Sequence, residues 1–379
     1  MGDEYSQTVQ IFIGTTFHER TFIPRGGVSH YMSNPFCEVK VMPTIVISGA
    51  SAGVGRATVR RFAAPGARIA LIARNRERLE NAAEEVRRAG GQALVLPLDV
   101  SDAQAVEDAA ARTEEAFGPI DIWVNVAMVT VLARVIDTEP DEYRRVTEVT
   151  YLGTVHGTLA ALKRMTRRDR GVIVQVCSAL AYRSIPLQSA YCAAKSAIVG
   201  FTDSLRSELI HDGSNVKITA VQLPGVNTPQ FDWARNKMGY RQMPVPPIFQ
   251  PEVIADAIWQ AAHKPRREYW LGFSSFKAIM SEKIAPTIGD HYVAHNAFES
   301  QLTNEKLRER PDNLYETVDG DPGAHGRFDS KASNRSPAIW ASEHRDAVVA
   351  AAGIGLLGLL AFGMTRRATG SHDRRPRLR

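Results

Sequence analysis

Cysteine is scarce in this chain of 379 residues, which has only Cys37, Cys177 and Cys192. Three scattered cysteines are too few for a disulfide framework and lack the spacing of a zinc site. Histidines on separate segments show no ligand spacing either, so we expect no metal site (His18, His30, His156, His211). A reducing, cytosolic setting is the simplest interpretation, with Cys177 and Cys192 packing inside the domain.

A basic surface is missing from most of the chain. The net charge of +5 is accounted for by the tail 366–379, which carries six arginines and one acid, Asp373. The remainder is close to neutral, so we expect no nucleic-acid partner. With 44% hydrophobic and 23% charged residues, wholesale disorder, collagen-like repeats and a multi-span membrane protein are excluded.

The N-terminal region lacks a secretory pattern, because its longest apolar run, Ile11 to Ile13, is far too short. A strong strand pattern begins at Thr44, two residues after Met42. We therefore expect Met42 to be the natural start and residues 1–41 to be an N-terminal extension. The alternative is an additional strand or arm that packs on the domain.

One long uncharged run is present near the C-terminus, from Ala347 to Met364. As a helix, these eighteen residues would extend about 27 Å, near the thickness of a bilayer core. We predict a membrane anchor at 346–365, and Ala351 and Gly355 could bring two such helices together. The alternative is a buried C-terminal helix in a dimer.

The orientation of this segment stays open. The arginines of the tail 366–379 favour a cytoplasmic C-terminus, and the region before this segment, which shows no secretory pattern, also favours the cytoplasm. A single span cannot leave both ends inside, so the segment either lies in the interface or crosses despite the charge of the tail. We expect the main domain to be cytoplasmic and anchored to the inner face of a membrane.

Short apolar runs alternate with helical patterns from Met42 to about residue 275, within an expected domain of residues 42–310. The expected strands are 44–48, 68–72, 93–98, 120–126, 171–177, 216–222 and 268–272. Expected helices include Arg76 to Ala89 and Asp102 to Phe117, the latter opened by a capping box of Ser101 and Gln104. This alternation predicts an α/β fold with a doubly wound parallel sheet of the Rossmann type. Residues 311–345, rich in Asp, Gly, Pro, Ser and Asn, are expected to be a linker or a surface arm.

A glycine-rich turn follows the first expected strand directly. Glycines in such a turn let the backbone approach a pyrophosphate, and the following helix offers free N–H groups. Any tight turn uses glycine, but here strand, turn and helix come in the right order. The predicted cofactor contacts are Gly49, Ser51, Gly53, Val54 and Gly55.

The end of the second strand predicts which dinucleotide binds. Enzymes that prefer NAD usually place an acid there, whereas this chain has Ala73 followed by Arg74. A guanidinium suits a 2′-phosphate, which favours NADP(H) over NAD(H). The alternative is an exposed arginine at a helix cap. Asp99 and Val100, after the third strand, are expected beside the adenine.

The strongest pattern combines Ser178, at a strand end, with Tyr191 and Lys195. A spacing of four residues places the phenol and the ammonium on one helix face. Lowering the phenol pKa from about 10 to neutrality requires about 4 kcal/mol of preferential stabilisation of the phenolate. Lys195 and an oxidised nicotinamide could supply it, while Ser178 would donate a hydrogen bond to the substrate oxygen.

On these motifs, residues 42 to about 275 resemble the short-chain dehydrogenase/reductase family. The resemblance implies a Rossmann fold with Ser178, Tyr191 and Lys195 as catalytic residues, Tyr191 and Lys195 also contacting the cofactor. It implies a homo-oligomer, and it assigns the loop after the sixth strand to the nicotinamide end (Pro224, Gly225, Val226, Thr228). The stretch 181–189 is similar to a bacterial subgroup that often carries a C-terminal apolar extension.

Two departures from the family pattern concern the same site. The Asn-Asn-Ala-Gly of the family is here Asn125-Val126-Ala127-Met128, of which Asn125 and Ala127 are expected to contact the cofactor. Met128 adds bulk near the nicotinamide ribose. In the family, a catalytic asparagine helps hold a water that relays protons from the lysine to solvent. Thr150 stands at that position here, so the resemblance places Thr150 among the catalytic residues, although its side chain is shorter than that of asparagine.

The loop after Pro229 is rich in aromatic residues, Met and Pro (Phe231, Trp233, Met238, Tyr240, Met243, Pro244, Pro246, Pro247). Such a loop suits an apolar carbonyl or alcohol substrate. The alternative is that these residues pack a dimer face or the domain core. The sequence as a whole predicts an NADP(H)-dependent oxidoreductase that interconverts a secondary alcohol and a ketone or aldehyde. The alternative is a catalytically weak NADPH-binding scaffold or redox sensor at a membrane.

Overall fold

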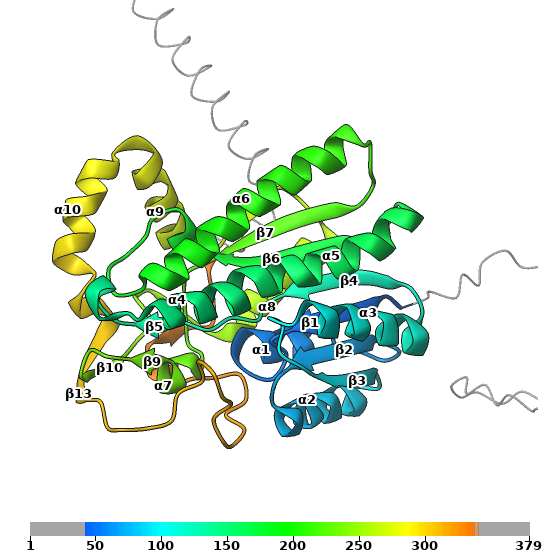
Figure 1. The fold of residues 1–379 in the computed structure, drawn as a ribbon, viewed down its shortest axis with the longest axis horizontal. Helices are drawn as coiled ribbons and strands as arrows, with labels where there is room; N and C mark the ends of the chain where they lie inside the picture. Colours follow the sequence, from blue (N-terminus) through cyan, green and yellow to red (C-terminus); the bar gives the residue numbers. More distant parts are fainter. Residues whose placement is uncertain (1–41, 338–339, 341–379) are drawn as a thin grey trace, which may run out of the picture. The chain divides into compact units, whose positions relative to one another are not determined.

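The computed structural model describes residues 42–337 and 340 (Figure 1). A seven-stranded parallel sheet runs in the order β12-β7-β6-β4-β1-β2-β3. Its strands are β1 (Thr44–Ser48), β2 (Arg68–Ala73), β3 (Gln92–Pro97), β4 (Ile120–Asn125), β6 (Val172–Ser178), β7 (Lys217–Leu223) and β12 (Glu268–Trp270). The predicted strands are confirmed, with ends that differ by at most two residues.

Side chains alternate between the two faces of the sheet, and both faces are buried. Ile45 and Ile47 of β1 belong to one apolar core, whereas Val46 between them belongs to the other. The first core is covered by α1 (Gly53–Phe62), α2 (Arg76–Arg88) and α8 (Pro251–His263), and the second by α3 (Ala103–Phe117), α5 (Gly153–Met165) and α6 (Ser189–His211). Helices on both faces of a parallel sheet confirm the doubly wound α/β fold.

The predicted capping box at Ser101 is wrong. The carboxylate of Asp102 caps α3, accepting hydrogen bonds from the backbone N–H groups of Gln104 and Ala105 at 2.9 and 3.0 Å. The Ser101 hydroxyl donates instead to the Asp99 carboxylate at 2.8 Å. A charged acceptor one residue nearer the helix satisfies its first amides better than a hydroxyl does.

The order of the strands creates a crevice. After β1, β2 and β3 extend the sheet in one direction, and β4 then pairs with the other side of β1. Loops leaving the carboxyl ends of β1 and β4 therefore diverge to opposite faces, which is where open α/β sheets bind ligands.

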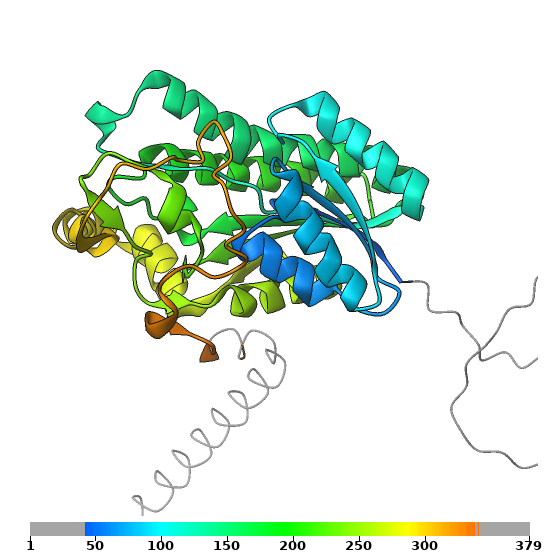
Figure 2. The ribbon, with the colours of Figure 1, turned by 90° about the horizontal axis from the view of Figure 1, so that it is seen from below.

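Smaller elements surround the carboxyl end of the sheet. They are the helices α4 (Pro140–Val146), α7 (Gln230–Trp233), α9 (Gly272–Ile284) and α10 (Pro286–Asn296), and the short strands β5 (Val131–Leu132), β8 (Gly225–Val226), β9 (Arg235–Asn236), β10 (Tyr240–Gln242), β11 (Ile248–Phe249), β13 (Leu302–Lys306) and β14 (Ala332–Ser333). A π-helical segment, Thr147–Leu152, links α4 to α5. In Figures 1 and 2, α9 and α10 stand at the end of the domain where β13 follows.

Residues 311–337 lie against this domain as an arm, of which Leu314 and Phe328 are buried. Across residues 42–337 and 340, no helix is both long and apolar enough to cross a bilayer. The predicted extension 1–41, the end of the predicted linker, the anchor 346–365 and the tail 366–379 lie outside the described residues.

Candidate active site

A cavity of about 1310 Å³ opens at the carboxyl ends of the strands. It lies at the strand-order reversal between β1 and β4, and it exceeds the usual size of a single small-ligand pocket. The structure brings together on its wall all but one of the residues expected to contact a dinucleotide: Gly49, Ser51, Gly53, Val54, Gly55, Arg74, Asp99, Val100, Ala127, Tyr191, Lys195, Pro224, Gly225, Val226 and Thr228.

The glycine turn leaves no room for side chains. Gly49 has φ +70°, and a Cβ there would lie 2.8 Å from the backbone N of Ala127. A Cβ on Gly55 would lie 2.0 Å from the Gly49 carbonyl oxygen. No side chain caps the N-terminus of α1, where Ala52 is the N-cap residue. The bare backbone of the turn, and a helix end that carries no side-chain cap, fit a pyrophosphate group.

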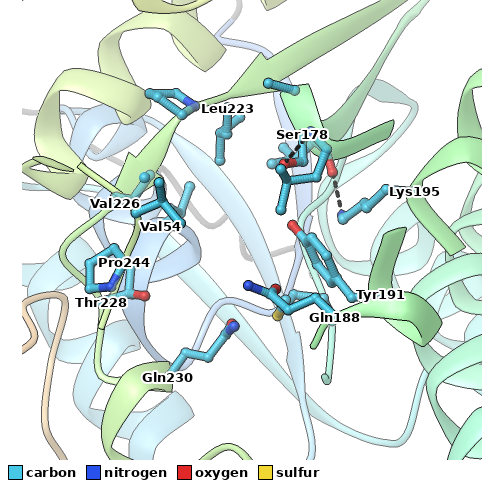
Figure 3. Close-up of a pocket in the computed structure, with 18 of the residues that line it drawn as sticks. Val54, Ser178, Gln188, Tyr191, Lys195, Leu223, Val226, Thr228, Gln230 and Pro244 are labelled. Atoms are coloured by element: carbon cyan, nitrogen blue, oxygen red, sulfur yellow. Dashed lines mark hydrogen bonds between the residues drawn. The ribbon is translucent and has the colours of Figure 1, made fainter. Parts of the chain in front are cut away.

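Ser178, Tyr191 and Lys195 meet on the opposite wall of the cavity (Figure 3). Ser178 ends β6, while Tyr191 and Lys195 lie one turn apart on α6, as their spacing predicts. Lys195 donates to the Val176 carbonyl at 2.7 Å, and its Nζ lies 5.6 Å from the centroid of the Tyr191 ring. The Ser178 hydroxyl oxygen accepts a hydrogen bond from the Leu180 backbone N–H at 3.2 Å.

Burial controls the pKa of both titratable groups. It lowers the pKa of Lys195 from 10.5 to about 8. It raises the pKa of Tyr191 above its ordinary value, opposed by a hydrogen bond with Ser178. The protein groups alone leave the phenol pKa raised, because the cost of removing the phenolate from water outweighs the hydrogen bond with Ser178. That Lys195 and an oxidised nicotinamide together lower this pKa stays a prediction.

Thr150 lies in the π-helical segment and does not line the cavity. Its buried hydroxyl accepts from the Val129 N–H at 3.1 Å and donates to the Val129 carbonyl at 3.0 Å. Since Val129 lines the cavity, Thr150 positions a segment of the wall and is not itself exposed to a ligand.

Asn125 is the expected cofactor contact that the structure places elsewhere. It is 3% exposed, and its Nδ2 donates to Gln175 at 2.9 Å and to Thr158 at 3.2 Å. Its Oδ1 accepts from the Trp123 indole at 2.8 Å. The amide is directed into the layer between β4 and α5, because alternation along the strand turns it away from the cavity.

The groups at the end of β2 and β3 already have protein partners. Arg74 donates to the carbonyls of Asn313 and Tyr315 at 2.6 and 2.7 Å, and burial lowers its pKa. Burial raises the pKa of Asp99, but hydrogen bonds from Arg145 and Ser101 outweigh this and hold it below its ordinary value. Asp99 is thus an ionised carboxylate paired with a guanidinium.

The apolar part of the cavity comes from two regions. Met238, Tyr240 and Met243 of the predicted substrate loop do not line the cavity. Five other residues of that loop do line it: Phe231, Trp233, Pro244, Pro246 and Pro247. Sequence reasoning missed the contribution of α9, α10 and the arm (Phe273, Ile288, Tyr292, Val293, Asn313, Thr317, Val318). No motif marks these residues, because their part in the wall follows only from the tertiary packing.

Cys177 and Cys192 are 1% and 2% exposed. Burial raises the pKa of Cys177 to about 12 and also raises that of Cys192. Neither thiol is activated as a nucleophile, in agreement with a packing role. Within residues 42–337 and 340, no three potential metal ligands come together.

Comparison with known proteins shows which proteins this chain is similar to. Residues 43–238 match the short chain dehydrogenase family. The uncharacterized oxidoreductase YxnA of Bacillus subtilis (strain 168) is 31% identical over 332 residues, which cover 85% of this chain and 90% of that protein. The uncharacterized oxidoreductase Mb1570 of Mycobacterium bovis is 33% identical over 261 residues, covering 67% and 73% respectively.

A solved structure is also similar. It is an alcohol dehydrogenase from the archaeon Thermococcus sibiricus complexed with 5-hydroxy-NADP, 28% identical with a TM-score of 0.52. The match covers 60% of this chain and 94% of that one. Fold, cleft and relatives agree: the chain belongs to the short-chain dehydrogenase/reductase family of oxidoreductases.

Proposed function

We propose that this protein is an NADP(H)-dependent oxidoreductase that interconverts a secondary alcohol and a ketone or aldehyde. The observation that carries the proposal is the convergence of Ser178, Tyr191 and Lys195 on the cavity that also holds the glycine turn. A nicotinamide bound there would supply or accept the hydride. Hydride transfer to or from carbon requires a proton to move at the oxygen, and these three side chains provide for it.

Each side chain has a distinct role in the proposal. The Ser178 hydroxyl accepts from the Leu180 N–H and shares a hydrogen bond with Tyr191, and it would donate its proton to the substrate oxygen when a substrate binds. Tyr191 transfers a proton to or from that oxygen. Lys195, with a pKa of about 8, is charged at neutral pH and can counter a phenolate as it forms.

The preference for NADP(H) is supported by the end of β2. Ala73 provides no carboxylate to repel a 2′-phosphate, and Asp99, the nearby acid on the cavity wall, is paired with Arg145. Arg74 would hold the 2′-phosphate, the glycine turn the pyrophosphate, and residues 224–228 the nicotinamide end. The Thermococcus sibiricus enzyme was solved with 5-hydroxy-NADP, which accords with this choice.

A lipophilic substrate is supported by the apolar side chains in the cavity wall, which include Phe231, Phe273 and Ile288. As part of the same proposal, residues 346–365 associate with a membrane and the protein forms homo-oligomers. Membrane association is proposed from the uncharged run in the sequence. Homo-oligomer formation is proposed because members of the family commonly form homo-oligomers.

The test has a binding part and a turnover part. We expect the full chain to bind NADPH in the micromolar range and NADH much more weakly, with Arg74→Ala removing most of this difference. Tyr191→Phe should bind NADPH as the wild type does but reduce a panel of apolar ketones about 10²–10⁴-fold more slowly.

Tyr182→Phe is the matched control, because the Tyr182 hydroxyl donates to Glu268 at 2.7 Å and is not part of the cavity wall. Its turnover should stay within a few-fold of the wild type. Equal turnover by Tyr191→Phe and wild type would refute the assignment. NADPH binding without turnover of any ketone would instead favour the scaffold or redox sensor.

A further inference from the structure

The arm, residues 311–337, runs across the outside of the domain (Figure 2). Asn313, Thr317 and Val318 near its start, and Ser336 and Pro337 at its end, line the cavity. At the Arg74 end, Arg74 donates to two arm carbonyls, and Arg78 donates to those of Gly320 at 2.6 Å and Asp319 at 3.3 Å. The guanidinium of Arg78 also lies 4.7 Å from the ring centroid of Trp233, across the cleft.

The middle of the arm reaches the glycine turn. The backbone N–H of Gly53, the first residue of α1, donates to the Gly323 carbonyl at 3.0 Å. Asp321 secures this part of the arm, since its carboxylate accepts from Asn81 at 2.9 Å and lies 3.5 Å from Arg56. The arm therefore contacts the turn that we assign to the pyrophosphate.

The end of the arm contacts the loop at residues 224–228. The Asn227 side chain accepts from the Phe328 N–H at 3.0 Å and donates to Asp329 at 2.8 Å. A Cβ on Gly326 would lie 2.5 Å from the Thr228 carbonyl oxygen, so the two backbones are in close contact. Beyond this point β14 pairs with β11, which itself pairs with β8.

The contacts of the arm are concentrated at the groups that we assign to the coenzyme. The arm holds three groups assigned to the coenzyme site: Arg74, the first amide of α1 and the 224–228 loop. Its residues Asn313, Thr317 and Val318 line the same cavity as those groups. Leu314 is 0% exposed and anchors the arm in the core shared by α3, α5 and α6.

We propose that the arm is the outer wall of the coenzyme site and that its release controls how fast the coenzyme leaves. This inference rests on the proposed function, because it assumes that a nicotinamide coenzyme binds in the cavity. A coenzyme enclosed between the arm and the strand ends dissociates only when arm contacts break at several points along its length. The protein then keeps its coenzyme for much longer than an open Rossmann cleft would.

The test measures release of the coenzyme, which does not depend on catalysis. Full-length protein loaded with NADPH is mixed with excess NADP⁺, and the loss of bound-NADPH fluorescence gives the dissociation rate. We expect Leu314→Ala to release NADPH at least tenfold faster than the wild type. The matched control is Leu209→Ala, because Leu209 belongs to the same buried core but lies on α6, and it should change the rate less than twofold.

A second variant covers the case in which Leu314→Ala does not fold. Asp321→Ala removes the contacts with Asn81 and Arg56 at a partly exposed position, and we expect several-fold faster release. Hydrogen exchange provides an independent readout, because NADPH should slow exchange of backbone amides in 311–328.

The outcomes separate the two proposals. Release at the wild-type rate from folded arm variants, with unchanged exchange in 311–328, would overturn the role of the arm while leaving the proposed function intact. Absence of any binding of NADPH and NADH to the full-length protein would overturn both.

Discussion

The buried charge of Lys195 should lower the free energy of unfolding of the protein, even though the proposed reaction requires that charge. It is 3% exposed, and burial lowers its pKa from 10.5 to about 8. That shift corresponds to about 3 kcal/mol of destabilisation when the ammonium is charged. Lys195→Met removes this term and also the hydrogen bond to the Val176 carbonyl, which contributes about 1 kcal/mol. We expect the variant to be about 2 kcal/mol more stable at pH 7 and to lose turnover.

The pH dependence follows from the direction of the shift. Below pH 8 both folded and unfolded chains carry the ammonium, so the full destabilisation is present. Between the folded pKa of about 8 and the unfolded value of 10.5, the folded chain loses this proton first. The unfolded chain then binds more protons, and the free energy of unfolding of the wild type rises with pH. The advantage of Lys195→Met should shrink by about 2 kcal/mol between pH 7 and pH 10.

Urea unfolding of the coenzyme-free protein, followed by circular dichroism at pH 7 and pH 10, measures both effects. Lys163→Met is the control, because the Lys163 side chain is 62% exposed and pairs with Glu107 on the surface, so its effect should stay within about 0.5 kcal/mol. If Lys195→Met were no more stable than the wild type at pH 7, with a difference that does not vary with pH, the charge-burial argument would fail.

Two further substitutions test how the cavity wall is held. Thr150→Val removes both hydrogen bonds to Val129 and should lower the free energy of unfolding by about 1–3 kcal/mol. Thr147→Val, at an exposed position of the same π-helical segment, should change it by less than about 0.5 kcal/mol; similar values in urea unfolding would contradict the role of Thr150. Gly49→Ala and Gly118→Ala both introduce Cβ at positive φ, but only the first meets backbone within 4 Å. Gly49→Ala should therefore lower the Tm more than Gly118→Ala does, and it should weaken NADPH binding. If the two variants lowered the Tm equally, the positive φ alone would explain the loss, and the close backbone contact at Gly49 would not.

The sequence predicted the sheet and the chemistry-bearing motifs because both depend on short-range spacing. Apolar runs of five to seven residues, such as 44–48 and 172–178, form buried strands wherever helices cover both faces. The turn from Gly49 to Gly55 and the pair Tyr191 and Lys195 are local in the same sense, since neighbouring residues determine their backbone shape and helix face.

Asn125 and Ser101 show where local reasoning fails. Asn125 ends a strand beside the cavity, but strand alternation and the facing Gln175 and Thr158 direct its amide into the core. Ser101 has the spacing of a cap, yet Asp102 captures the helix amides and Asp99 captures the serine. In each case the polar partner lies on another segment or at a neighbouring position, and three-dimensional distance decides which hydrogen bond forms.

By itself, the sequence determined the doubly wound fold, the glycine turn and the spacing of Ser178, Tyr191 and Lys195. Only the tertiary structure decided that Arg74 is held by Asn313, 239 residues later in the chain, and that α9, α10 and the arm line the cavity. The physical reason is that periodicity and turn chemistry act over a few residues, whereas these contacts form only after the sheet has brought distant segments together.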